Sequence, residues 1–292
     1  GNINKSQKEF DMKIYSNDKK AKIPFLKWRY QADINFDKLE FKYKKDNSNK
    51  DKNQGLVSIN NLIINYEKFS RSTVTLNHLH LDYSVNIENN FLELSKETKL
   101  IINNLTFKPY IKFIFYPKKQ KRFQLNTDKF LAQNLFDSLP EGMFHVLRGL
   151  KTRGELSYDL KFSINFENPD SLILDSKMQK NNFGILSLGS IPLTIINKPF
   201  VYTAFEKGEP VKSFDVDELN SNYRKLEDIS KYLKSAIIAS EDPEFYHHNG
   251  FMRDAIRESI ITDIKKKRFA RGGSTITMQL VKNIFLNKNK TI

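Results

Sequence analysis

The chain has 292 residues, 39% hydrophobic and 12% aromatic, which suffices for two domains with packed cores and argues against disorder. The formal net charge of +14 favours an anionic partner, although a general abundance of Lys explains the charge equally well. There is no cysteine, so disulfides and cysteine-based metal sites are excluded. No apolar run approaches the roughly 20 residues that span a membrane. No secretory signal is visible. The chain starts with Gly and not Met, which is expected either of a processed protein or of a recombinantly expressed fragment, and an upstream anchor would then have been removed.

Residues 1–200 are predicted to be β-rich. A short pattern occurs four times. It consists of two apolar residues separated by one residue, then a pair of polar residues, then two more apolar residues separated by one residue. Alternation of this kind buries one face of a strand, and the polar pair shifts its phase by one residue. None of the pairs contains Gly, so bulged strands are favoured over tight turns. The polar pairs are Asp37-Lys38, Asn60-Asn61, Asn77-His78 and Asn103-Asn104.

Three further features complete this region. Long alternations over residues 79–87 and 156–166 support the prediction of strands. Residues 127–150 between them are predicted to be helical, with a break at Pro140-Glu-Gly. The charged run over residues 44–54 predicts a loop tip.

The repeated amphipathic strands, ending in LRGLKTRGELSYDLKFSINF, resemble the strand-rich domains of the AsmA-like family. That resemblance implies an envelope protein with a long curved sheet. No catalytic constellation stands out in this half, so we interpret it as a structural scaffold.

Residues 201–292 change character and are predicted to be mostly helical. Residues 226–240 carry an apolar stripe at helical spacing. Residues 251–267 form a second predicted helix, which runs into a basic segment ending at Arg271. After two glycines, Ser274 is expected to cap a third helix that extends to about Asn287.

The third predicted helix carries a polar face. Thr275, Gln279 and Lys282 lie at i, i+4 and i+7 and so share one side. Free backbone N–H groups behind the two glycines are expected to attract an anion, and Lys282 to hold a phosphate. The alternative is an ordinary amphipathic helix with a solvated lysine.

The stretch EDPEFYHHNG, from Glu241 to Gly250, is the candidate chemical centre. A catalytic Glu241 needs partial burial to raise its pKa, and Phe245 and Tyr246 are expected to supply an apolar wall. Asp242 and His248 are expected to orient it by hydrogen bonds. The alternative is that SEDPE simply starts a helix, with a cap, acids and Pro in its first turn.

Taken together, the two stretches resemble the first two motifs of the peptidoglycan glycosyltransferases, glycosyltransferase family 51. The first has the pattern E-D-x-x-F-x-x-H-x-G and the second G-S-T-x-T-x-Q-x-x-K-N. The matching residues are Glu241, Asp242, Phe245, His248, Gly250, Gly273, Ser274, Thr275, Thr277, Gln279, Lys282 and Asn283.

This resemblance implies a mostly α-helical, lysozyme-like domain that polymerises lipid II into a β-1,4-linked glycan strand. Glu241 would be the general base, supported by Asp242 and His248, and the second motif would line the substrate cleft with Lys282 near the donor phosphate. The family also implies an anionic membrane surface as partner and the periplasmic face of a bacterial inner membrane as location, with the anchor outside this sequence. It implies no cofactor and leaves a divalent metal open.

Some residues depart from the family pattern. Met252, Arg271 and Met278 stand where members often have an acid or a glutamine. The family also has a second essential glutamate further along, and no acid follows Asp263 here. We therefore expect half of a transferase domain that is inactive alone.

Three other functions remain open. A lysozyme-like hydrolase would need a second carboxylate near Glu241. A non-enzymatic envelope scaffold would use the β-rich half to bind lipid or a partner, with a degenerate transglycosylase segment. Nucleic-acid binding rests on charge alone, because the basic segment lacks interleaved aromatic residues. The expected architecture is α+β, with a β-rich domain over residues 1–200 and a partial helical domain over 201–292.

Overall fold

The computed structural model describes residues 2–4, 9–16, 21–22, 31–46, 51–67, 70–191, 193–206 and 209–285. The chain divides into two compact units between Ser190 and Ile191. Within the described ranges, no helix is both long and apolar enough to cross a membrane.

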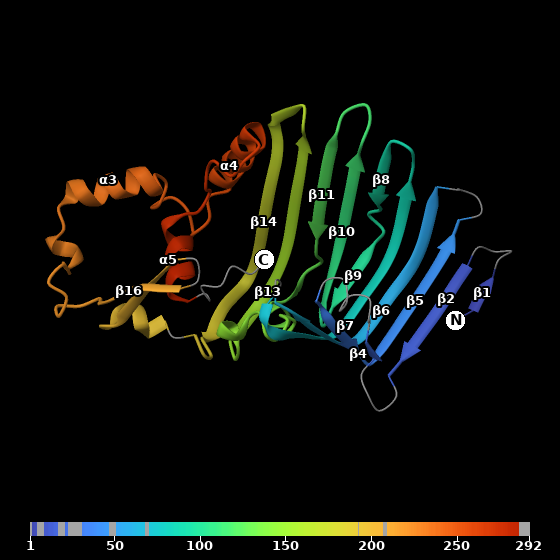
Figure 1. Ribbon diagram of the computed structural model, residues 1–292, viewed down its shortest axis with the longest axis horizontal. Coiled ribbons are helices and arrows are strands. Elements are labelled where there is room, and N and C mark those ends of the chain that lie inside the picture. The colour runs from blue at the N-terminus through green and yellow to red at the C-terminus, as the bar shows by residue number, and fades with distance from the viewer. Residues whose placement is uncertain are drawn as a thin grey trace. The chain divides into compact units, whose positions relative to one another are not determined.

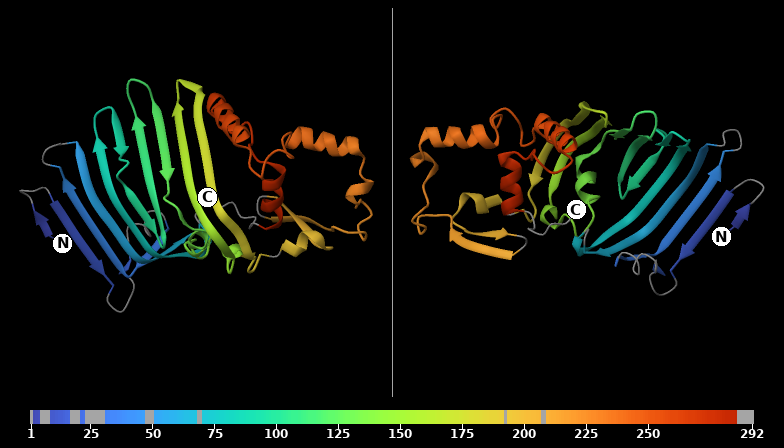
Figure 2. Two further views of the ribbon diagram at one scale, coloured as in Figure 1. Left: turned by 180° about the vertical axis from the view of Figure 1, so that it is seen from behind. Right: turned by 45° about the horizontal axis from the view of Figure 1, so that its top comes forward.

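The first unit is built on one twisted sheet, seen from two sides in Figures 1 and 2. Most neighbouring strands are antiparallel hairpin partners that follow one another in the chain, in the order β1-β2-β5-β6-β7-β8-β10-β11-β13-β12. Four short or terminal strands join this path: β14 pairs with β13, β3 with β4, β4 also with β6, and β9 with β7 and β10. The strands are β1 (Asn2–Asn4), β2 (Glu9–Tyr15), β3 (Ala21–Lys22), β4 (Asp33–Phe36), β5 (Lys38–Lys45), β6 (Lys52–Tyr66), β7 (Ser70–Ile87), β8 (Phe91–Leu94), β9 (Lys99–Ile102), β10 (Leu105–Ile114), β11 (Gln120–Asn126), β12 (Phe130–Leu131), β13 (Lys151–Asn165) and β14 (Asn168–Ser187).

One face of this sheet is apolar because the strands are in matching register. A row of half-buried apolar residues crosses six strands at the same height, and it consists of Met12, Phe41, Val57, Leu81, Leu100 and Phe107. Fully buried side chains include Phe36, Val74 and Leu156. The short helix α2 (Ala132–Asp137) contacts β12 and β13, and its Ala132 is wholly buried.

The polar pairs behave in different ways. Asn60-Asn61 lies inside the continuous strand β6, where Asn61 has a φ of +51° and no register shift occurs toward β7. Asn77-His78 lies within β7 in the same stretch of ladder. The prediction of bulges is therefore wrong at these two pairs. Asn103-Asn104 is a two-residue turn between β9 and β10, so the preference for a bulge over a turn is wrong there too.

The predicted helix over residues 127–150 is also wrong. Only α2 and a 3-10 turn, η1 (His145–Leu147), are helical in this range. Phe130 and Leu131 pair with β13 as a strand, so their backbone groups form hydrogen bonds across the sheet and not along a helix. Gly142 and Gly149 have φ values of +86° and +76°, which ends any helix around them. The predicted loop over residues 44–54 is shorter than expected, because β5 runs to Lys45 and β6 starts at Lys52, and residues 47–50 lie outside the described ones.

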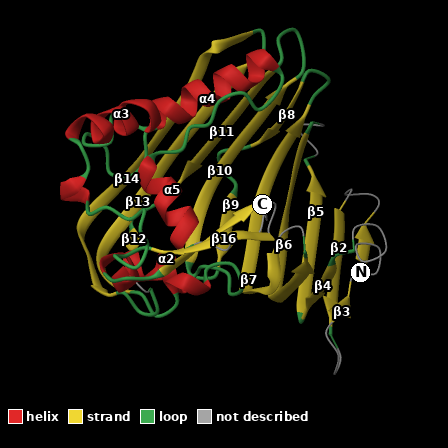
Figure 3. Cartoon of the chain, turned by 60° about the vertical axis from the view of Figure 1, so that its left-hand side comes forward, coloured by secondary structure: helices red, strands yellow, loops and turns green. Residues whose placement is uncertain are grey.

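The second unit contains a two-stranded hairpin and three α-helices, shown in Figure 3. Its only fully buried hydrophobic side chain among the described residues is Ile261 of α4. The three helices lie close to the predicted ones, although α3 starts later because residues 226–228 form a separate 3-10 turn. Its elements are η2 (Leu193–Asn197), β15 (Val201–Glu206), β16 (Glu209–Asp215), η3 (Leu226–Asp228), α3 (Lys231–Glu241), α4 (Arg253–Lys266) and α5 (Ile276–Ile284).

Candidate functional site

Two consecutive carboxylates at the end of α3, those of Glu241 and Asp242, lie in different surroundings. Ser230 caps the start of this helix by accepting a hydrogen bond from the N–H of Tyr232. Glu241 is the last helical residue and is exposed, whereas Asp242 follows with a φ of −159° and is completely buried. SEDPE therefore ends a helix and does not start one, so the alternative interpretation of this stretch as a helix start is wrong.

Asp242 is the centre of a buried hydrogen-bond network. Its Oδ1 lies 2.9 Å from Nε2 of His248, and its Oδ2 accepts the N–H of Ile276 at 3.0 Å. The N–H of Gly250 donates to Nδ1 of His248 at 3.0 Å. A backbone N–H can only donate, so Nδ1 carries no proton and Nε2 carries it. His248 is therefore a neutral imidazole that donates to the carboxylate of Asp242.

Thr275 joins the same network from the second motif. Its buried hydroxyl donates to the carbonyl of Gly250 at 2.6 Å and accepts the N–H of Met278 at 3.1 Å. Thr275 is thus the cap of α5, and the prediction that Ser274 has this role is wrong. Gly250 has a φ of +92°, which favours glycine, and a Cβ there would lie 3.3 Å from Cγ2 of Thr277.

The start of α5 already has a negative partner inside the protein. The N–H groups of Ile276 and Met278 are bound by Asp242 and Thr275. A buried carboxylate at a helix N-terminus is favoured by both the free amides and the helix dipole. These two amides are therefore not free for a substrate anion, which corrects the expectation at Ile276 and Met278.

The side chain of Glu241 is hydrogen-bonded to a residue of the second motif. The amide of Gln279 donates from Nε2 to Oε2 of Glu241 at 3.1 Å, on an exposed surface. Asp242 and His248 bind each other and the backbone, so the predicted orienting bonds to Glu241 come instead from Gln279. The predicted apolar wall is also absent in this form: Tyr246 is 77% exposed, and Phe245 packs edge-on against the ring of His248.

The remaining residues of the second motif occupy different positions. Ser274 and Lys282 are exposed, and Lys282 lies one turn beyond Gln279 on α5. Asn283 is half-buried. Gly273 packs against α4, where a Cβ would lie 2.9 Å from Cα of Ile256.

Two residues that sequence reasoning missed hold the second motif in place. Asp263 of α4 accepts the N–H groups of Ala270 and Arg271 on Oδ1, at 2.7 and 3.0 Å. Ser259, one turn earlier, donates to the carbonyl of Arg271 at 2.7 Å. The spacing of Ser259 and Asp263 on one helix face was the only available signal, and it does not reveal which loop they bind.

Gly273→Ala is expected to destabilise the second unit by about 1–3 kcal/mol, because the new methyl group meets the backbone of Ile256. Gly272→Ala is the matched control, because its Cβ would have no neighbour within 4 Å. Urea unfolding followed by far-UV circular dichroism measures the difference. Equal stability of the two variants would contradict the close contact between the second motif and α4.

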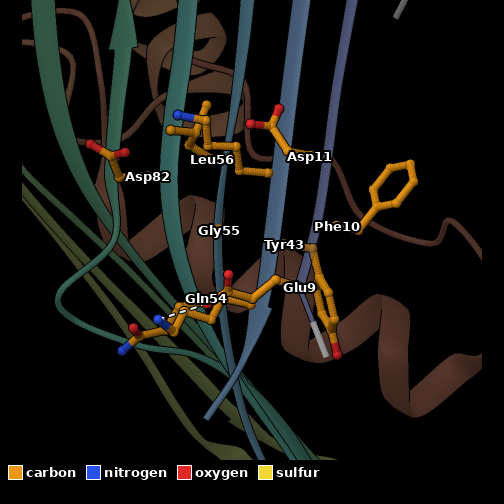
Figure 4. Close-up of a pocket in the computed structure, with 10 residues that line it drawn as sticks. Glu9, Phe10, Asp11, Tyr43, Gln54, Gly55, Leu56 and Asp82 are labelled. Atoms are coloured by element: carbon orange, nitrogen blue, oxygen red, sulfur yellow. Dashed lines mark ion pairs between the residues drawn. The ribbon is translucent and has the colours of Figure 1, made fainter. Parts of the chain in front are cut away.

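Two hollows are lined by residues outside the two motifs. One, of about 440 Å³, lies on the first unit (Figure 4). Asp11, Lys42, Leu56 and Asp82 follow one another as cross-strand partners on β2, β5, β6 and β7, and Glu9 forms an ion pair with Lys44 at 2.8 Å. The other, of about 530 Å³, lies on the second unit beside η2 and includes Lys225. Neither contains a residue of the two motifs, and the described part of the chain has no cluster of three or more His, Asp or Glu arranged to hold a metal.

Comparisons with known proteins match the region that carries both motifs. Residues 207–292 match the family model described as "Transglycosylase". The chain is 48% identical over 73 residues to a protein of Nitrosospira multiformis named biosynthetic peptidoglycan transglycosylase, which covers 25% of this chain and 32% of that protein. Proteins of the same name from Nitrosomonas eutropha (43% over 75 residues; 26% and 31%) and Mannheimia succiniciproducens (42% over 90 residues; 30% and 36%) are also similar. No solved structure matches the chain.

Residues 207–292 therefore match the transglycosylase family model, and the resemblance indicated by the two motifs is confirmed over this region. The chain spans about a third of the length of the curated relatives it matches. Residues 1–206 lie outside the matched family segment.

Proposed function

We propose that this chain contributes the first part of a peptidoglycan glycosyltransferase domain that polymerises lipid II into β-1,4-linked glycan during cell-wall synthesis. The observation that carries the proposal is the contact between Glu241 and Gln279, which unites one polar residue from each motif at an exposed carboxylate. The buried network around Asp242 supports it, because that network fixes the backbone on both sides of this contact.

In the proposed reaction, Glu241 takes the proton of the acceptor's sugar 4-hydroxyl as that oxygen attacks C1 of the donor chain. The bond from C1 to the lipid pyrophosphate breaks, the pyrophosphate leaves with the electron pair, and the configuration at C1 inverts. Gln279 would hold the carboxylate of Glu241 in position, and Lys282 would lie near the departing phosphates. Because two first-turn amides of α5 are occupied by Asp242 and Thr275, the phosphates would rely on side-chain cations.

The architecture around this site is part of the proposal. We infer a lysozyme-like domain of which α3, α4 and α5 are the first helices, and an AsmA-like sheet over the first unit. A lipid-linked substrate requires a membrane surface, so we place the site at the periplasmic face of a bacterial inner membrane. Lipid II and the growing glycan strand are the proposed substrates.

A hybrid enzyme tests the proposed function. The matching segment of the Nitrosospira multiformis relative is replaced by the corresponding residues of this chain, and the hybrid is incubated with labelled lipid II. The proposal expects long glycan polymer. Cleavage of preformed glycan with new reducing ends would favour the hydrolase, and a well-folded hybrid with neither product would favour a non-enzymatic scaffold.

A further inference from the structure

Asn249 and Gly250 form the only Asn-Gly pair in the chain. The backbone nitrogen that follows an asparagine can attack Cγ, the carbon of the side-chain amide, and close a five-membered succinimide ring. A following glycine hinders this attack least, because it has no Cβ. Asparagine is a thermolabile residue for this reason. Asn249 lies inside the first motif, at a position that the motif pattern leaves open, so the pair places a reactive side chain beside the candidate site.

The nitrogen that would attack, that of Gly250, has a base beside it. Its N–H donates to Nδ1 of His248 at 3.0 Å. Nε2 of the same ring lies 2.9 Å from Oδ1 of Asp242, which is completely buried. A nucleophile bonded to a base that is itself oriented by a third group is the arrangement that activates nucleophiles in covalent catalysis. Asp242 would stabilise the positive charge on the ring of His248 once it has taken the proton.

The two reacting residues differ in how firmly they are held. Gly250 has a φ of +92°, and its carbonyl accepts the hydroxyl of Thr275 at 2.6 Å. The side chain of Asn249 is exposed, and it has no hydrogen bond among the contacts of the described residues. Its carboxamide can therefore turn toward the nitrogen of Gly250, and solvent water can reach the product.

We propose that Asn249 is a self-modification site, at which His248 promotes the loss of ammonia from the asparagine side chain. Nδ1 of His248 takes the proton of the Gly250 N–H, and the nitrogen of Gly250 forms a bond to Cγ of Asn249. The bond from Cγ to the side-chain nitrogen breaks, and this nitrogen leaves as ammonia with the proton returned by His248. One water molecule then opens the succinimide to aspartate or to isoaspartate.

Either product changes the first motif. Aspartate adds a negative charge next to His248. Isoaspartate adds one carbon to the main chain before Gly250, which would displace Gly250 from both His248 and Thr275. Because the bond from Thr275 to Gly250 joins the two motifs, the reaction would loosen the candidate site as the protein ages. The inference rests on this network and its test uses no lipid II, so its failure and failure of the proposed function are distinguishable.

Mass spectrometry of one tryptic peptide measures the reaction. Cleavage after Lys234 and after Arg253 releases a peptide in which Asn249 is the only asparagine and no glutamine occurs. The full chain is kept folded at neutral pH in water labelled with heavy oxygen and is digested in ordinary water, so only acid formed before digestion carries the label. The folded chain is expected to form labelled product about ten-fold faster than the same chain unfolded in guanidinium chloride. A folded chain that reacts no faster than the unfolded one would overturn the proposal.

His248→Gln separates the base from the fold. The glutamine oxygen can still accept the N–H of Gly250, but it cannot take the proton, so labelled product is expected to form about ten-fold more slowly. His247→Gln is the matched control, because His247 is the exposed neighbour with no bond to Gly250, and it should leave the rate within about two-fold. Equal rates in the two variants would overturn the role of His248. Far-UV circular dichroism checks that both fold, and the comparison of folded with unfolded native chain decides if His248→Gln does not.

Discussion

Glu241→Gln in the hybrid enzyme is expected to lower the rate of lipid II polymerisation by at least about a hundred-fold, the size of a lost general base. Glutamine has nearly the same shape, but it cannot accept the proton of the acceptor hydroxyl. Because Glu241 is exposed and its side chain bonds only to Gln279 among the contacts of the described residues, the substitution should leave stability unchanged. The initial rate of polymer formation from labelled lipid II measures the effect.

Glu244→Gln is the matched control for this substitution. Glu244 is an exposed acid three residues further along the same motif stretch, outside the positions of the motif pattern. Its replacement is expected to change the rate by less than about two-fold, as for a charge screened by solvent. If both variants lose activity equally, the effect comes from the local charge, and Glu241 is not the base.

Asp242→Ala is expected to destabilise the second unit by about 3 kcal/mol, because two buried donors lose their acceptor. These donors are the N–H of Ile276 and Nε2 of His248. Most described α-helical residues lie in α3, α4 and α5, so far-UV circular dichroism during urea unfolding follows this unit.

Asp242→Asn is the graded control, because its single carbonyl oxygen can keep one of the two bonds. It is expected to unfold between the native chain and Asp242→Ala. Hydrogen exchange at the amide of Ile276 should accelerate in Asp242→Ala, since that amide is bound by Oδ2. A native-like unfolding curve for Asp242→Ala would contradict the role of this carboxylate as the link between the two motifs.

The sequence predicted the helices of the second unit because their apolar residues recur at helical spacing. It also predicted that the two motifs belong together, and the bond between Glu241 and Gln279 shows them in contact. It did not predict that Glu241 would be exposed while Asp242 is buried in a hydrogen-bond network. This difference arises at the end of α3, because the backbone leaves helical geometry at Asp242 and the two side chains point in different directions.

The choice of cap shows a second limit of local reasoning. Ser274 and Thr275 are both good cap residues, so composition cannot choose between them. The structure favours Thr275 because its hydroxyl also reaches the carbonyl of Gly250, 25 residues earlier in the chain. A tertiary contact therefore decides where α5 begins.

The β-rich unit shows the same limit. Asn60-Asn61 and Asn103-Asn104 have the same local pattern, but one lies in a continuous strand and the other in a turn. The amide oxygen of Asn103 accepts the N–H of His78, and the N–H of Asn103 donates to the carbonyl of His78. These bonds to β7 hold the turn, and local sequence carries no information about them.

The rate of lipid II polymerisation by the hybrid enzyme, relative to that of its Glu241→Gln variant, tests the central proposal most directly. The proposal predicts polymer from the hybrid and a loss of at least about a hundred-fold in the variant. A folded hybrid that makes no polymer, or one whose rate is unchanged by the substitution, would contradict it.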